Sequence, residues 1–230
     1  MPSMTKTLYF LLSALVTAIS VGLLGFAMSR KWSHTTMDCA PIGSDLFNGT
    51  AVIKMTLFNG MFHRDSCPSF GSTASFDVFP LMGKTGGTAV VLQVLTVGLL
   101  ALCLLFSAVS ILISLYNSVS NPYQTYLGPV GVYTCSSLSA CLSVVVLIIY
   151  VLNLGVTNTP EDMVIIGYDV EVELRNKSLD MQVGYFLVIP YTVLSLAAVF
   201  MIYMYDHAAY TQRREQERPT EDAPKEIMMY

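Results

Sequence analysis

The chain has 230 residues, of which 53% are hydrophobic and 12% are charged, and its mean hydropathy is +0.58. Soluble domains carry roughly 25% charged residues and disordered chains need low hydrophobicity, so the composition argues against both classes. The 12 basic residues are scattered and cannot form the cationic face of a nucleic-acid-binding protein. Residues 85–160 contain no Asp, Glu, Lys, Arg or His. A stretch of this kind is typical of helices that cross a membrane, so the lipid bilayer is the first predicted partner.

Four stretches have the roughly 20 apolar residues that a membrane-spanning helix needs. They are residues 7–29, 88–116, 130–151 and 181–205. The first could instead be a cleaved signal peptide, but its apolar core is longer than the roughly 7–15 residues of a signal sequence. None of the four contains an acid, a base or a histidine. Ion-coupled transporters and proton pumps place such groups within the membrane, so this absence argues against transport.

The orientation is predicted from basic residues and from glycosylation sequons. Arg30 and Lys31 after the first span argue for an outer N-terminus, whereas Arg213 and Arg214 after the fourth argue for a cytoplasmic tail. Two Asn-x-Ser/Thr sequons, at Asn48 and Asn176, both fall in odd-numbered loops. They favour a plasma-membrane protein with both termini in the cytoplasm. The extracellular loops are then residues 30–87 and 152–180, and the cytoplasmic tail is 206–230.

Both outer loops contain residues that alternate between apolar and polar, which is typical of half-buried strands. The alternation covers residues 50–58, 75–79 and 168–175. We therefore expect a small extracellular β-sheet, mostly from the first loop, to which the second loop adds a strand; an unstructured loop is the alternative. The predicted fold class is a single-domain, membrane all-α bundle of four transmembrane helices with this sheet.

Two of the five cysteines, Cys39 and Cys67, lie in the first outer loop, where the compartment is oxidising. We predict a disulfide between them, with two free thiols as the alternative. The other three, Cys103, Cys135 and Cys141, lie in spans, where small buried packing residues are expected.

Small residues recur along the first span at Ala14, Ala18 and Gly22, with a spacing of four. Such faces let helix backbones approach closely. They predict either packing among the four helices or lateral association with other membrane proteins. In the fourth span, Pro190 removes one helical hydrogen bond, which predicts a kink.

The large first loop, Trp32 after the first span and Gly60-Met61-Phe62 before Cys67 resemble the claudin-like four-span superfamily. Claudins place two cysteines close together after that signature, whereas here Cys39 lies upstream of it. Residues 121–133 read Asn-Pro-Tyr-Gln-Thr-Tyr-Leu-Gly-Pro-Val-Gly-Val-Tyr and resemble the inner-loop signature of the clarin family. The tail, residues 212–219 with the terminal Tyr230, is also similar to clarins. The resemblance covers the whole chain and implies a role in membrane organisation, junctions and actin-linked scaffolds of sensory cells.

The sequence holds no nucleophile–base pair, metal-ligand cluster or Gly-rich phosphate loop, so no enzyme, metal or cofactor is predicted. The final Met228, Met229 and Tyr230 have the form that PDZ grooves accept, and clarins resemble one another in such endings. The favoured hypothesis is a glycoprotein that associates laterally in the membrane and connects to cytoplasmic scaffold.

Two other functions are considered. One is a subunit or accessory of an ion channel, for which the acidic face of Asp169, Glu171 and Glu173 is the only support. The other is a junction protein that forms a barrier, as the claudin-like first loop implies.

Overall fold

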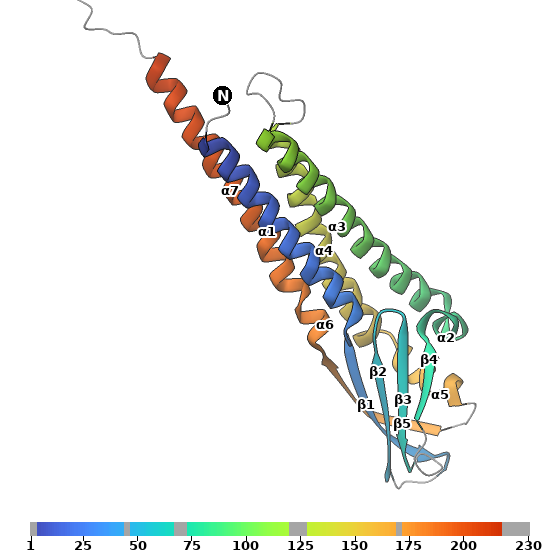
Figure 1. The fold of residues 1–230 in the computed structure, drawn as a ribbon. Helices are drawn as coiled ribbons and strands as arrows, with labels where there is room; N and C mark the ends of the chain where they lie inside the picture. The colour runs from blue at the N-terminus through green and yellow to red at the C-terminus, as the bar shows by residue number, and fades with distance from the viewer. Residues whose placement is uncertain (1–3, 44–46, 67–72, 120–127, 169–171, 218–230) are drawn as a thin grey trace, which may run out of the picture.

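A computed structural model describes residues 4–43, 47–66, 73–119, 128–168 and 172–217. Four helices in these ranges are long and apolar enough to cross a membrane: α1 (Met4–Ser29), α3 (Gly87–Val119), α4 (Pro129–Gly155) and α7 (Val188–Glu217). They run side by side as one bundle, and a sheet projects from one end of it (Figure 1). The apolar stretch of α7 also includes the short helix α6 (Val183–Phe186).

The sheet has five antiparallel strands in the order β4-β3-β2-β1-β5. Four come from the first loop: β1 (Ser33–Pro41), β2 (Gly49–Met55), β3 (Asn59–Asp65) and β4 (Thr73–Asp77). The fifth, β5 (Val172–Met181), comes from the second loop and pairs with β1. The predicted combination of a sheet from loop one with a strand from loop two is therefore present. Because both loops build one sheet, both lie on the same side of the membrane.

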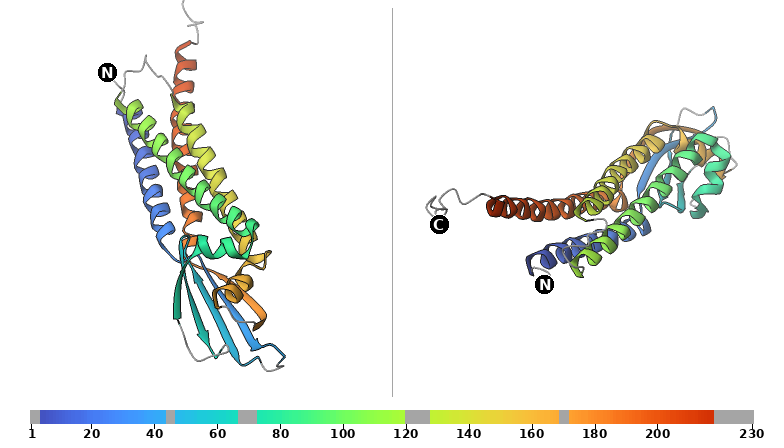
Figure 2. Two further views of the ribbon diagram at one scale, coloured as in Figure 1. Left: turned by 90° about the vertical axis from the view of Figure 1, so that its right-hand side faces the viewer. Right: turned by 90° about the horizontal axis from the view of Figure 1, so that it is seen from above.

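Two short helices complete the sheet end of the molecule. α2 (Val78–Thr85) follows β4 directly, and α5 (Thr159–Tyr168) precedes β5. Both lie beside the sheet where it meets the bundle (Figure 2). Alternate sheet residues point towards them and are buried, among them Met37, Ile53 and Phe62. On the opposite face the alternating residues are half-buried or exposed.

The ends of several elements differ from the prediction. The alternation at residues 168–175 predicts a strand from Tyr168, but Tyr168 ends α5 and the strand begins at Val172. The strand then continues to Met181, where the fourth apolar segment was expected to start. The expected strand at residues 75–79 also changes, since Val78 and Phe79 belong to α2.

The fourth helix is interrupted at Leu187, between α6 and α7. Pro190 has no N–H to donate to the carbonyl of Phe186, and this missing bond accounts for the break near the predicted kink. At the other end, α7 continues twelve residues beyond Tyr205, through Glu217. Its 30 residues make a helix of about 45 Å, longer than the roughly 30 Å hydrocarbon core. The first part of the tail is therefore helical.

Each spanning helix has a row of buried residues that recur at alternating intervals of three and four positions. This is the 3.5-residue repeat of left-handed helical bundles. The positions of this repeat are Phe10, Ser13, Thr17, Ser20, Leu24 and Ala27 in α1; Gln93, Thr96, Leu100, Cys103, Ser107, Ser110, Ser114 and Asn117 in α3; Val132, Ser136, Ser139, Ser143, Val146, Tyr150 and Asn153 in α4; and Val188, Tyr191, Ser195, Ala198 and Ile202 in α7. Ala14, Ala89, Ala140 and Leu154 are also buried, beside these positions. The interior of the bundle is thus made largely of small and hydroxyl-bearing residues.

Candidate functional site

The centre of the bundle is a hydrogen-bonded group of hydroxyls around Tyr191 of α7. The Tyr191 hydroxyl lies 2.9 Å from Ser107 Oγ and donates to Ser139 Oγ (3.1 Å) and the Cys103 carbonyl (3.2 Å). All these side chains are buried, and they come from three helices. One turn towards the tail end, Ser110 Oγ and Ser136 Oγ lie 2.9 Å apart. Such bonds join helices where the surrounding lipid supplies no hydrophobic driving force.

This cluster of hydroxyls does not continue through the bundle. Leu100 and Val146, both fully buried, separate it from the polar residues nearer the sheet. Within the described residues, no cluster of His, Cys, Asp and Glu could hold a metal ion. Among the described residues, the interior of the helix bundle is therefore interrupted by an apolar layer and forms no continuous polar path.

Two buried amides lie at the sheet end of α3 and α4. Gln93 Nε2 donates to the Leu57 carbonyl (2.9 Å), and Asn153 Nδ2 donates to the Ala89 carbonyl (3.4 Å). The Gln93 bond ties the turn between β2 and β3 to the second turn of α3. The carbonyl oxygens of both amides are buried and have no partner among the described protein atoms.

Trp32 joins the sheet to the bundle. Its indole is fully buried, donates to the Ala27 carbonyl (2.8 Å) and packs edge-to-face on Tyr150 with centroids 5.0 Å apart. Its backbone amide bonds the Met55 carbonyl (2.8 Å), which aligns β2 with the end of α1. Gly184 of α6 lies against the indole, where an added Cβ would come within 2.5 Å of Trp32 Cδ1.

The Gly60-Met61-Phe62 segment lies near the start of β3, which pairs with β2 on one side and with β4 on the other. Gly60 leaves room for the ring of Phe76, which would collide with a Cβ. Phe62 stacks on the same ring with centroids 4.2 Å apart, and Gly167 of α5 leaves room for Phe62 in turn. The residues that carry the claudin-like resemblance therefore shape the sheet and its junction with the bundle. Neither Trp32 nor Phe62 is available at the surface.

The three small residues singled out in α1 do not share one environment. Ala14 is buried in the bundle, whereas Ala18 and Gly22 are exposed. At Gly22 an added Cβ would meet no atom within 4 Å. The interior of α1 is formed instead by Ser13, Thr17 and Ser20. These buried residues recur at alternating intervals of three and four positions, and a search for a constant spacing of four does not find them.

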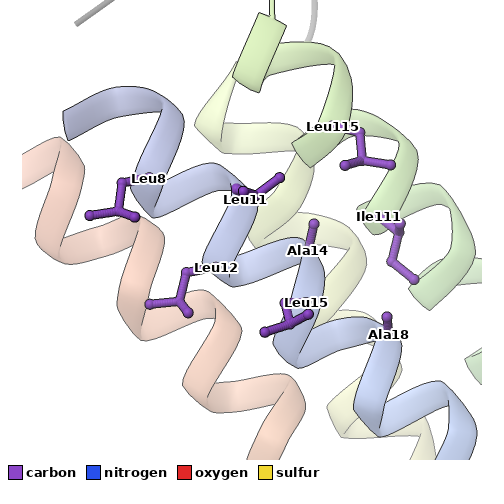
Figure 3. Close-up of a pocket in the computed structure, with 8 residues that line it drawn as sticks. All are labelled: Leu8, Leu11, Leu12, Ala14, Leu15, Ala18, Ile111 and Leu115. Atoms are coloured by element: carbon purple, nitrogen blue, oxygen red, sulfur yellow. The ribbon is translucent and has the colours of Figure 1, made fainter. Parts of the chain in front are cut away.

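An apolar groove of about 410 Å³ runs beside these residues between α1 and α3 (Figure 3). It is lined by Leu8, Leu11, Leu12, Ala14, Leu15, Ala18, Ile111 and Leu115. Ala14 and Ala18 point into it from α1, with Ile111 and Leu115 opposite on α3 (Figure 3). Gly22 lies one turn beyond Ala18, so the groove and the exposed small residues form one continuous outer surface on α1.

Both sequon asparagines are exposed and lie at the sheet. Asn48 directly precedes β2. Asn176 lies within β5 at a change of register and has φ +53°, a conformation that asparagine tolerates better than most residues. Its Nδ2 donates to Asp38 Oδ2 (2.8 Å).

Cys39 is buried near the end of β1 and is disulfide-bonded. Its predicted partner, Cys67, lies outside the described residues, so the pairing remains a prediction. Cys103, Cys135 and Cys141 are free thiols, of which Cys103 is buried and Cys141 is exposed. The predicted packing role therefore fits Cys103 better than Cys141.

Several other residues singled out in the sequence lie outside the described ranges. They are the inner-loop residues 121–127, the acidic residues Asp169 and Glu171, and the terminal residues Met228, Met229 and Tyr230.

Four membrane-length helices with one antiparallel sheet define a tetraspan membrane protein. A family model described as Clarin-2-like matches residues 4–164. Clarin-3 of Mus musculus and Clarin-3 of Homo sapiens are each 29% identical to this chain, and Clarin-3 of Rattus norvegicus is 30% identical. Each alignment spans 234 positions and covers the whole of both chains. The chain belongs to the clarin family, which confirms the resemblance seen in its sequence.

Proposed function

We propose that this clarin is a non-enzymatic organiser of membrane proteins that binds its partners laterally through the outer surface of α1. The observation that carries the proposal is the continuous surface of exposed Ala18 and Gly22 beside the groove between α1 and α3. Exposed small residues allow another helix to approach closely within lipid. The large apolar residues that flank them provide the contact area for such a partner.

The bundle interior supports an organiser better than a channel. The hydroxyls around Tyr191 bond one another, and the layer of Leu100 and Val146 separates them from the polar residues near the sheet. Glu173 belongs to the acidic face that supports the channel hypothesis. It is exposed on β5, and its Oε2 lies 3.9 Å from Arg175 Nη2. A channel would therefore need several copies, with its pore between them.

The proposed location is the plasma membrane, with the sheet outside and both termini in the cytoplasm. The first and last helices place their free ends at the bundle end opposite the sheet (Figure 1). Asn48 and Asn176 are exposed on the sheet side, in agreement with their use as glycosylation sites. A disulfide between Cys39 and Cys67 would brace the same region. We further propose that Met228, Met229 and Tyr230 bind a PDZ-type scaffold.

Substitution of Ala18 and Gly22 tests the lateral interface. The double change Ala18→Leu and Gly22→Leu should reduce crosslinking to co-purifying membrane proteins, because branched side chains keep a partner helix away. Gly98→Leu is the matched control, since Gly98 is an exposed glycine of α3 with no atom within 4 Å of an added Cβ. Equal crosslinking by the double variant and the control would contradict the proposal.

Removal of residues 228–230 tests the scaffold connection separately. The truncated chain should keep its membrane partners and lose cytosolic PDZ proteins in affinity capture. An unchanged set of cytosolic partners would show that the terminal residues are not the binding segment.

The two other functions have tests of their own. Reproducible single-channel currents from the purified, reconstituted chain would favour the channel function. A protein that does not concentrate at contacts between expressing cells would argue against a claudin-like barrier.

A further inference from the structure

Two phenylalanines lie exposed at the end of the sheet that meets the bundle. Phe58, in the turn between β2 and β3, is 45% exposed, and Phe79 of α2 is partly exposed. Their ring centroids are 6.3 Å apart. The Val78 amide donates to the Phe58 carbonyl (2.8 Å), so the turn and α2 are held together. Most other large apolar residues of the sheet are covered by α2, α5 or the bundle.

Three hydrogen bonds fix the depth of this pair relative to the spanning helices. The Trp32 amide bonds the Met55 carbonyl, which places the end of β2 three residues beyond the end of α1. Gln93 bonds the Leu57 carbonyl, which places the following turn beside the second turn of α3. The Val78 bond then brings Phe79 to the same level. Figure 1 shows this turn reaching the height at which α1 ends and α2 lies.

The outer surfaces of the helices locate the edge of the lipid at that level. On α3 the exposed residues are apolar and most of them are large from Val91 onwards, and Val94 is 52% exposed. On α1 the last large apolar exposed residue is Phe26, and the exposed Arg30 and Lys31 follow it. Phe58 therefore lies at the boundary between apolar and charged surface, beside residues that face lipid.

We propose that Phe58 and Phe79 form a membrane-anchoring pair that inserts into the lipid leaflet on the sheet side of the bilayer. Phenylalanine is among the side chains that interfacial segments bury at the boundary between headgroups and acyl chains, where the ring leaves water. Insertion holds the turn between β2 and β3 against the membrane, and Trp32 holds the sheet at the end of α1. The sheet then has two attachments to the membrane region and a defined tilt. This inference depends only on the transmembrane bundle, not on which side of the membrane the sheet faces.

Tryptophan fluorescence in lipid nanodiscs tests the proposal. Trp32 is the only tryptophan and is fully buried, so it provides a constant background. Phe58→Trp and Phe79→Trp each add a reporter at the pair. Ile42→Trp is the matched control, because Ile42 is 59% exposed and follows β1 at the end of the sheet far from the bundle. The wild-type chain gives the baseline, and circular dichroism confirms that the variants fold.

The expected result is a loss of emission from Phe58→Trp and Phe79→Trp when the phospholipid carries bromine on its acyl chains. Aqueous iodide should quench these variants less than Ile42→Trp, which bromine should not quench beyond the baseline. Strong iodide quenching of Phe58→Trp without bromine quenching would overturn the proposal, because the ring would face water. Protection from both quenchers would also overturn it, because a second copy of the chain would then cover the pair. Neither outcome depends on the crosslinking test of α1.

Discussion

The sheet end and the membrane bundle of this clarin are built on opposite rules. At the sheet end most of the buried residues are large and apolar, as with Trp32, Leu57 and Phe62, and the exposed strand residues are mostly polar. In the bundle the buried residues are mainly serine, threonine and alanine, and the large exposed ones are mostly leucine, isoleucine and valine. The two regions meet at Trp32 and Tyr150, where the large apolar core extends into the sheet end of the bundle.

The surrounding solvent explains the difference. In water, burial of apolar surface drives folding, so the sheet end needs large side chains in its interior. In lipid, an apolar side chain gains little by turning inward, and helices associate through close packing and hydrogen bonds. The same substitution should therefore have different effects in the two regions.

The largest effect is expected from Trp32→Ala. Loss of this fully buried indole should lower the free energy of unfolding by roughly 3–5 kcal/mol. Leu105→Ala, on the lipid-facing side of α3, should have little effect, because an unfolded helix in the membrane exposes the same side chain to lipid. Thermal unfolding in detergent, followed by circular dichroism, measures both. Similar losses would mean that the two regions do not follow different rules.

Gly184→Ala tests the packing at the junction. An added methyl group would lie 2.5 Å from Trp32 Cδ1 and 2.8 Å from the Lys31 carbonyl, so we expect a loss of roughly 1–3 kcal/mol. Gly98→Ala is the control, since nothing lies within 4 Å of its added methyl group and alanine favours helix by up to about 1 kcal/mol. The two variants should shift the midpoint of unfolding in opposite directions. A stable Gly184→Ala variant would show that Trp32 can move.

Tyr191→Phe tests the hydroxyls inside the bundle. It removes the bonds to Ser107, Ser139 and the Cys103 carbonyl while keeping the ring. Interhelical hydrogen bonds in membranes average about 0.6 kcal/mol, so a loss near 1 kcal/mol is expected. Tyr203→Phe, at an exposed tyrosine of the same helix, is the control and should leave the unfolding midpoint unchanged. A loss as large as that of Trp32→Ala would contradict the comparison.

The smallest effect is expected at Asp162 of α5. Burial raises the pKa of its carboxyl, and Glu161 raises it further, although Lys177 lowers it. The folded chain therefore holds the proton more tightly than the unfolded chain, and wild-type stability falls as pH rises through the folded pKa. Asp162→Asn should have a slightly higher unfolding midpoint than wild type at neutral pH, and the two should converge in acid. An unfolding midpoint of Asp162→Asn equal to that of wild type at neutral pH would contradict this prediction.

Much of the architecture could be predicted because lipid imposes a strong pattern on a sequence. The apolar segments at residues 7–29, 88–116 and 130–151 each lie within one helix. The strand at Gly49–Met55 follows the first part of the alternation predicted at residues 50–58, because one face is buried and the other is not. Residues 56–58 form the turn to β3 instead. β1 and β3 were not predicted, since residues such as His34, Asp38 and Asn59 carry little strand signal of their own. Their positions depend on pairing with β2.

The candidate interaction surface was less predictable. A spacing of four links Ala14, Ala18 and Gly22, but the bundle turns only Ala14 inward. A spacing of four among small residues cannot by itself distinguish the inner side of a membrane helix from the side that faces lipid. The 3.5-residue repeat does distinguish them, and it becomes evident once Ser13, Thr17 and Ser20 are seen to lie inside.

The sequence by itself determined the membrane setting, the four helices, the presence of a sheet and the family. These features follow from local composition and from matches along the chain, and they need no knowledge of contacts. Only the tertiary structure decided which small residues are interior, that Trp32 and Gly184 form one joint, and that Phe58 lies beside Phe79 where the sheet meets the bundle. These depend on residues that are far apart in the chain and meet only when the helices and strands pack.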